Sequence, residues 1–125
     1  MPIHYERDDA RRRIVVTVSG PLQASEMLSA IERKRAEGTW AYGGLTDLRR
    51  MTGTLTLGDL RDIMNKAATD PLTEATHGPV AILATNPDVY AVACKYAVLA
   101  GKKMRISVFR ELKEAQEWLQ AETSP

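Results

Sequence analysis

The sequence predicts a single α/β domain over residues 1–125, built on one mixed, mostly parallel sheet of about four or five strands with about four helices. Three observations support this fold class. A length of 125 residues with 44% hydrophobic content suits one compact domain. Segments with apolar residues at helical spacing alternate with short segments whose residue pattern predicts strands. The stretch 79–84 is almost wholly apolar, as expected for a strand covered on both faces.

Two strands are expected at the N-terminus. The segment 3–6 is short and partly apolar, and residues 14–18 form the β-branched run Ile-Val-Val-Thr-Val. Residues of this kind favour the pleated surface of a sheet, whereas the aspartates at positions 8 and 9 favour a turn. The pattern predicts an antiparallel hairpin whose second strand ends at residues 19–21.

The next segments predict a helix, a short strand and a second helix. Apolar residues recur at helical spacing up to Glu37, and Gly38 is a natural C-terminal stop. Residues 45–48 alternate in polarity as a strand does, and an Arg-, Thr- and Gly-rich turn is expected after them. Thr56 is the expected N-cap of the second helix, with Asp59 reaching back to it, and Pro71 is expected to close that helix.

The C-terminal half predicts two further strand–helix units. The apolar strand 79–84 is expected to mark the middle of the sheet, and Asn86-Pro87-Asp88 has the residues that begin a helix. That helix is expected to end at Gly101. A last strand is expected over 105–109, followed by a helix from Leu112 to about residue 121. The alternating order implies parallel strands joined by right-handed crossovers.

Composition excludes several function classes. A formal charge of +1 supplies no field to hold DNA or RNA, so no nucleic-acid partner is expected. Cys94 is the only cysteine, which rules out an intramolecular disulfide and indicates a reducing compartment. The charged segment 1–13 lacks the apolar region of a signal peptide, and the apolar stretch 89–100 is too short to span a membrane. We expect a cytoplasmic protein with no integral membrane segment.

Enzyme signatures are absent from the sequence. There is no G-x-S-x-G elbow, no G-x-G-x-x-G, no phosphate-binding G-x-x-x-x-G-K and no H-E-x-x-H. We therefore expect no cofactor and no metal. His4 and His77 are expected to be solvent-exposed or structural, and Cys94 to be a small buried hydrophobe. A small enzyme stays open only if the carboxylates and hydroxyls of Asp47, Thr56 and Thr85 converge in a closed pocket.

The expected binding site lies where strands end and helices begin. The loop 49–56 joins a strand end to a helix N-terminus, where backbone NH groups and the helix dipole favour an anion. The junction 85–88 has the same geometry, and a simple capping role is the alternative for both. In open α/β sheets, ligands collect beyond the carboxyl ends of parallel strands. The candidate binding residues are Asp47, Arg49, Arg50, Thr54, Thr56, Thr85, Asn86 and Arg110.

The order of elements and two segments resemble a known family. These segments are G-P-V-A-I-L-A-T-N-P-D-V-Y at 78–90 and V-F-R-E-L-K-E-A-Q-E-W-L at 108–119. Both are similar to the bacterial SpoIIAA-like proteins of the STAS superfamily, and the resemblance covers nearly the whole chain. STAS domains are typically protein-interaction modules, and related folds bind lipids or nucleotides. The resemblance thus implies a non-catalytic module that binds a protein partner or a small ligand, anionic or lipid-like, at the strand-end crevice.

The same resemblance implies a second function, a regulator switched by phosphorylation in the manner of anti-sigma factor antagonists. Some STAS domains are switched at a serine or threonine where the helix after the third strand begins. The family pattern there is an Asp-Ser-Ser-Gly-like turn, whereas this chain has T-G-T-L-T-L-G over residues 52–58. Thr56 is the nearest positional match and is therefore the phosphorylation candidate.

The helix expected from Pro87 to Gly101 predicts a homodimer. Asp88 and Lys95 are its only charged residues, whereas a helix that covers a sheet normally has a polar outer face. Because twofold symmetry makes one apolar patch self-complementary, a second copy of this helix is the expected cover. The alternative is that the N-terminal hairpin or the C-terminal helix folds over this face.

Overall fold

The computed structural model describes residues 3–68 and 77–123, and it confirms the predicted order of elements. One five-stranded sheet has the strand order β1-β2-β3-β4-β5, in which β1 is antiparallel to β2 and the other pairs are parallel. The elements are β1 (Ile3–Asp8), β2 (Arg13–Pro21), α1 (Ala24–Ala36), β3 (Gly43–Thr52), α2 (Leu57–Ala68), β4 (Val80–Leu83), α3 (Pro87–Ala100), β5 (Ile106–Phe109) and α4 (Leu112–Thr123).

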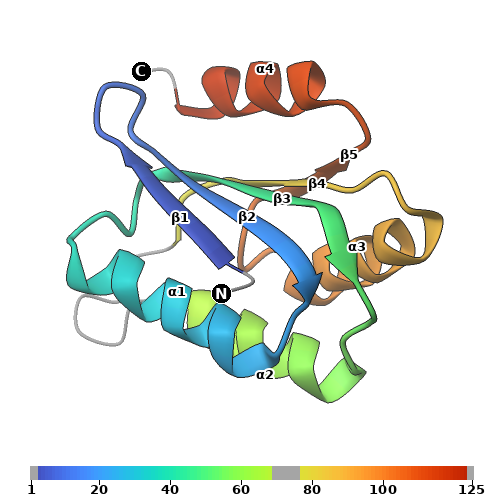
Figure 1. The fold of residues 1–125 in the computed structure, drawn as a ribbon. Helices are drawn as coiled ribbons and strands as arrows, with labels where there is room; N and C mark the ends of the chain where they lie inside the picture. Colours follow the sequence, from blue (N-terminus) through green and yellow to red (C-terminus); the bar gives the residue numbers. More distant parts are fainter. Residues whose placement is uncertain (1–2, 69–76, 124–125) are drawn as a thin grey trace.

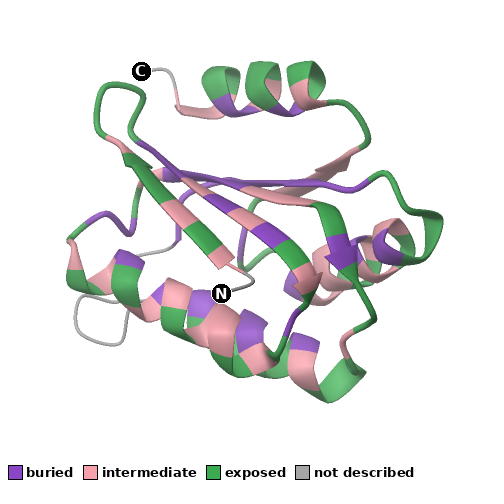
Figure 2. Cartoon of the chain, in the orientation of Figure 1, coloured by how far each residue is buried: buried purple, intermediate pink, exposed green. Residues whose placement is uncertain are grey.

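The helices form two layers of unequal size. Helices α1, α2 and α3 lie on one face of the sheet, and α4 lies on the other (Figure 1). Alternate side chains of β4 face the two helix layers. Val80 and Ile82 pack with residues of α1, α2 and α3, whereas Ala81 packs with Leu119 of α4. All four residues of β4 are buried, which confirms the strand covered on both faces (Figure 2).

The middle of the sheet is β3 and not β4. The apolar run predicted the centre of the sheet at 79–84, but β4 stands between β3 and the edge strand β5. The prediction was wrong because burial on both faces depends on the helices above and below a strand. It does not require a central place in the sheet.

One predicted turn is part of a strand. Residues 49–52 were expected in a turn and instead form the last part of β3, beside residues 19–21, where β2 ends as predicted. The two segments pair with each other, up to Pro21 beside Thr52. Pairing along a neighbouring strand therefore outweighs the turn preference of the Arg, Thr and Gly residues.

An irregularity in this pairing decides which side chains of β3 face the helices. The register advances from Thr17 beside Asp47 to Ser19 beside Arg50, so β3 carries one extra residue. Leu48 and Met51, three positions apart, consequently both turn toward the α1–α3 side, where they line the same pocket.

The predicted helix ends are confirmed where the structure describes them. The backbone N of Thr56 donates to Asp59 Oδ2 and that of Asp59 donates to Thr56 Oγ1, at 3.1 and 3.0 Å. Asn86 caps α3 through its side chain, and Gly101 ends that helix with a φ of +52°. The predicted stop at Pro71 lies outside the described residues. None of the described helices has the length and apolarity needed to cross a membrane.

Candidate functional site

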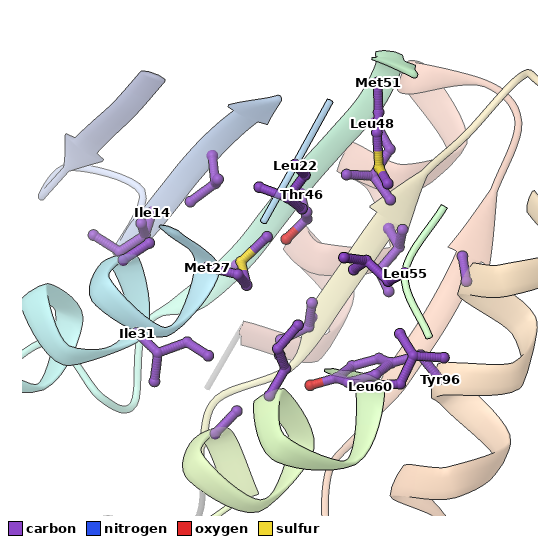
Figure 3. A pocket seen from close by; sticks show the side chains of 18 of the residues that line it. Ile14, Leu22, Met27, Ile31, Thr46, Leu48, Met51, Leu55, Leu60 and Tyr96 are labelled. Atoms are coloured by element: carbon purple, nitrogen blue, oxygen red, sulfur yellow. The ribbon is translucent and has the colours of Figure 1, made fainter. Parts of the chain in front are cut away.

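A pocket lies between the sheet and helices α1–α3 (Figure 3). Its cavity volume is about 120 Å³. A water-sized group needs roughly 10–15 Å³ on this measure, so the pocket has room for roughly ten such groups. The side chains labelled in Figure 3 are almost all apolar: Ile14, Leu22, Met27, Ile31, Thr46, Leu48, Met51, Leu55, Leu60 and Tyr96.

The pocket follows the direction of the parallel strands. At one end it is lined by Gly44 and Val80, which stand at the amino ends of β3 and β4. At the other end it is lined by Met51 at the carboxyl end of β3 and by Leu55, the residue before Thr56. Leu55 is only half-buried. The carboxyl edge of the sheet therefore offers the more accessible end.

Two basic side chains lie at the amino end of the pocket. Lys34 comes from α1 and is only 5% exposed, and His77, which precedes β4, is 7% exposed. Lys34 Nζ donates to the backbone oxygen of Tyr42 at 2.8 Å and lies 3.1 Å from His77 Nε2. His77 Nδ1 lies 2.8 Å from the backbone oxygen of Gly78. A carbonyl only accepts, so Nδ1 carries the proton and Nε2 is the acceptor that faces Lys34.

Burial controls the charge of both groups. It lowers the pKa of Lys34 from 10.5 to about 7 because water no longer solvates the ammonium. Burial, followed by the nearby Lys34 charge, lowers the pKa of His77 from 6.5 to about 3. Within residues 3–68 and 77–123, no acidic side chain forms an ion pair with Lys34. Among the described residues, the cation at the amino end of the pocket therefore has no carboxylate partner.

Two hydroxyl groups line the pocket among the apolar side chains. Thr46 comes from β3 and Tyr96 from α3 (Figure 3). Neither hydroxyl has a hydrogen-bond partner in the described part of the chain. Burial also raises the pKa of Tyr96, so the phenol stays protonated and can donate.

The sequence-predicted site residues lie along one edge, as the topology requires. Pairing sets Asp47 beside Leu83, and Leu83 beside Phe109, so Thr85 and Arg110 stand just beyond the carboxyl ends of β4 and β5. None of the eight predicted residues lines the apolar pocket. Their role in binding stays a prediction.

Several of these residues already have partners in the protein. The carboxylate of Asp47 receives both Nε and Nη2 of Arg49, at 3.0 and 2.8 Å. Partial burial acts to raise the pKa of Asp47, but the hydrogen bonds from Arg49 outweigh it and hold that pKa below its ordinary value. Arg110 lies over the ring of Tyr90, 4.3 Å from its centre.

The remaining predicted residues divide between caps and exposed positions. Thr56 and Asn86 cap α2 and α3, as described above. Arg50, Thr54 and Thr85 are exposed. The condition for an enzyme at this edge, a closed pocket shared by Asp47, Thr56 and Thr85, is not met in the apolar pocket, which none of the three lines.

Sequence reasoning missed the polar end of the pocket. Lys34 follows Met27 and Ile31 at helical spacing, so it occupies the apolar stripe of α1. A lysine on such a stripe was the available signal. His77, expected to be solvent-exposed or structural, is buried against Trp40 with ring centres 4.9 Å apart. His4, by contrast, is exposed and contacts Glu6 at 2.8 Å.

Comparison with solved structures identifies the fold. The chain is similar to an uncharacterized protein from the DUF3478 family with a SpoIIAA-like fold from Shewanella loihica PV-4, with a TM-score of 0.63 and 18% identity over 94% of this chain and 91% of that one. It is also similar to an anti-sigma factor antagonist from Mycobacterium paratuberculosis, with a TM-score of 0.59 and 18% identity over 94% and 92% of the two chains.

A third similar structure is the anti-sigma factor antagonist SpoIIAA in its unphosphorylated form. Its TM-score is 0.57, with 13% identity over 94% of this chain and 97% of that one. No family model and no curated protein matches the chain. The chain has the SpoIIAA-like fold, as the resemblance predicted.

Proposed function

We propose that this protein is a non-catalytic binding module that holds a small, largely apolar molecule between its sheet and helices α1–α3. The observation that carries the proposal is the pocket itself, whose lining is apolar apart from a few polar groups. Ligand sites in proteins commonly combine an apolar lining with a few placed polar groups. The ligand position differs from the strand-end crevice predicted from the sequence, although the pocket reaches that edge through Met51 and Leu55.

The unpartnered hydroxyls of Thr46 and Tyr96 support the same proposal. Both hydroxyls line the pocket without a hydrogen-bond partner in the described chain. Since every fully buried side-chain nitrogen or oxygen of the described residues has a partner, neither hydroxyl is sealed in the core. A bound molecule with a polar group would supply the partner. A purely structural cavity would gain nothing from these hydroxyls.

Calorimetric titration with octan-1-ol tests this proposal. The alcohol has about the number of non-hydrogen atoms that the cavity holds, and it carries no charge. We expect saturable binding to the wild type and its loss in Ala30→Phe, because Ala30 lines the pocket and the larger ring would occupy it. Ala91→Phe is the control, since Ala91 is exposed on α3 and does not line the pocket. Absence of binding to the wild type, or equal binding to both variants, would reject the proposal.

A regulatory function through a protein partner is the second candidate. Two of the similar structures are anti-sigma factor antagonists, and Thr56 stands exposed at the start of α2, where the resemblance places the switch. A phosphate at this position would meet the helix dipole and the carboxylate of Asp59, and would change the charge of the nearby surface.

Phosphosite mapping tests the second candidate. After incubation with a kinase extract of the host organism, we expect phosphate on Thr56 and not on Thr52 or Thr54. Thr56→Ala is the matched variant and should remove the signal. Phosphate on either neighbour alone, or none on the intact chain, would exclude the predicted switch.

A further inference from the structure

The pocket has one end that is chemically unlike the rest. Lys34 Nζ lies there beside the backbone of Tyr42 and the neutral ring of His77. Both of these partners are uncharged acceptors, which leaves the third N–H of the ammonium without a hydrogen bond in the described chain. The pocket lining around this end is mainly apolar.

A buried ammonium with only neutral partners is an energetically costly arrangement. Buried charges in proteins are normally paired with an opposite charge or bound to an ion. Here, no carboxylate in the described residues fills that role. An anionic group on a ligand would both neutralise the charge and accept the unused N–H.

The space beside Lys34 suits such a group. Gly44 lies next to Nζ, and a Cβ at that position would stand 3.8 Å from Nζ and 3.6 Å from Val80 Cγ2. Since glycine lacks this carbon, the room beside the ammonium stays open. The apolar lining then continues toward Met51 and Leu55 at the other end.

We propose that the pocket binds a monocarboxylic acid with an apolar chain of about eight carbons, whose carboxylate contacts Lys34 Nζ. This inference rests on the proposed binding function and names the class of ligand. One lysine matches the single charge of a carboxylate. A phosphate monoester would bring a second negative charge for which His77, neutral through its burial, provides no cation.

Binding of octanoate compared with octan-1-ol tests the inference. Both are titrated by calorimetry at about pH 6, where the lysine is protonated and the carboxylate is ionised. We expect octanoate to bind roughly tenfold more tightly than the alcohol, as a charge-assisted hydrogen bond allows. Octyl phosphate should bind more weakly than octanoate.

Variants assign the preference to Lys34. In Lys34→Met the preference for the acid should disappear while the alcohol still binds. Lys113→Met should keep the wild-type preference, because Lys113 is exposed on α4, on the other face of the sheet. Gly44→Ala should weaken octanoate more than octan-1-ol, since its methyl group occupies the space beside Nζ. Gly44→Ala and the wild type suffice to decide if Lys34→Met does not fold.

The outcomes separate the two proposals. Equal affinity of the wild type for the acid and the alcohol would overturn the carboxylate inference and leave the apolar binding function intact. A preference for the acid that survives in Lys34→Met would also overturn it. If neither octanoate nor octan-1-ol binds to the wild type, both proposals are overturned.

Discussion

Lys34 Nζ and His77 Nε2 lie 3.1 Å apart in the interior, and the charge of Lys34 adds to burial in disfavouring protonation of His77. Nε2 accepts from Lys34 only while the ring is neutral, and the ring is neutral because its own burial and the Lys34 charge disfavour the imidazolium. The pair therefore links the α1 helix to the segment before β4 through groups that titrate far from their ordinary pKa values.

This pair predicts that stability rises with pH on both sides of neutrality. The folded pKa of His77 is about 3 against an ordinary 6.5, so the unfolded chain binds more protons as pH falls below 6.5. For Lys34 the folded pKa is about 7 against 10.5, so the unfolded chain also binds more protons between these values. Lower pH therefore favours the unfolded chain in both windows.

Urea unfolding at several pH values measures the Lys34 contribution. Between about pH 7.5 and 9.5 we expect the free energy of unfolding to rise by about 1 kcal/mol per pH unit. Lys34→Met should remove this slope, whatever its effect on absolute stability. The pKa of Tyr5, raised to about 12 by burial, predicts the opposite trend only above its ordinary value of 10. A free energy of unfolding that does not change with pH between about 7.5 and 9.5 would contradict the lowered pKa of Lys34 in the folded protein.

Gly44 in β3 and Gly78 just before β4 should respond differently to substitution by alanine. A Cβ on Gly78 would lie 2.3 Å from the backbone oxygen of Tyr42 and 2.5 Å from that of Ala41, so the backbone itself must move. We expect Gly78→Ala to lower the free energy of unfolding by about 3 kcal/mol or more. Gly44→Ala meets only ordinary contacts and should change it by less than about 1 kcal/mol. Thermal unfolding of the two variants in parallel checks the contrast, and similar losses would contradict it.

The capping pair at the start of α2 gives a third prediction. Thr56→Ala removes the oxygen that accepts from the backbone N of Asp59, so the folded state should lose about 1 kcal/mol. Thr56→Ser keeps the hydroxyl and should stay within a few tenths of a kcal/mol of the wild type. Thr54→Ala is the control at an exposed neighbour. Chemical denaturation distinguishes them, and equal stability of all three variants would exclude the cap as a stabilising element.

The homodimer is still a prediction, and the structure limits its candidate interface to the outer side of α3. Helix α3 packs on the sheet and α2, while α4 lies on the opposite face, so the C-terminal helix does not cover α3. The outer side retains Val98, which is 79% exposed, together with exposed Ala91 and Lys95. If this face associates with a second copy, Val98→Glu should convert a dimer to a monomer in sedimentation velocity. A wild type that is monomeric at high micromolar concentration would exclude the prediction.

The fold was predictable because its signals are local. The cap at Thr56, the proline and cap before α3 and the apolar run of β4 each depend on residues close together in the chain. The length of β3 was not predictable, because residues 49–52 are held in the sheet by pairing with β2, which is distant in sequence. The polar end of the pocket was not predictable for the same reason. Lys34 and His77 are 43 positions apart and meet only through the tertiary structure.

The length of the pocket predicts how affinity depends on the carbon chain of the ligand. Each methylene moved from water into the apolar lining contributes about 0.8 kcal/mol, or about fourfold in affinity. We therefore expect affinity to increase steadily from butanoate to octanoate, because the cavity of about 120 Å³ still has room for the added carbons. Beyond that length the gain per carbon should fall, since further carbons must leave through the accessible end near Leu55. Calorimetric titration with the even-numbered acids up to dodecanoate, below their aggregation limits, measures the series. Ala30→Phe should lose binding throughout the series, because its ring occupies the pocket, whereas Ala91→Phe should leave the series unchanged. A constant gain through dodecanoate in the wild type would mean that the chains bind along an open surface and not in this pocket.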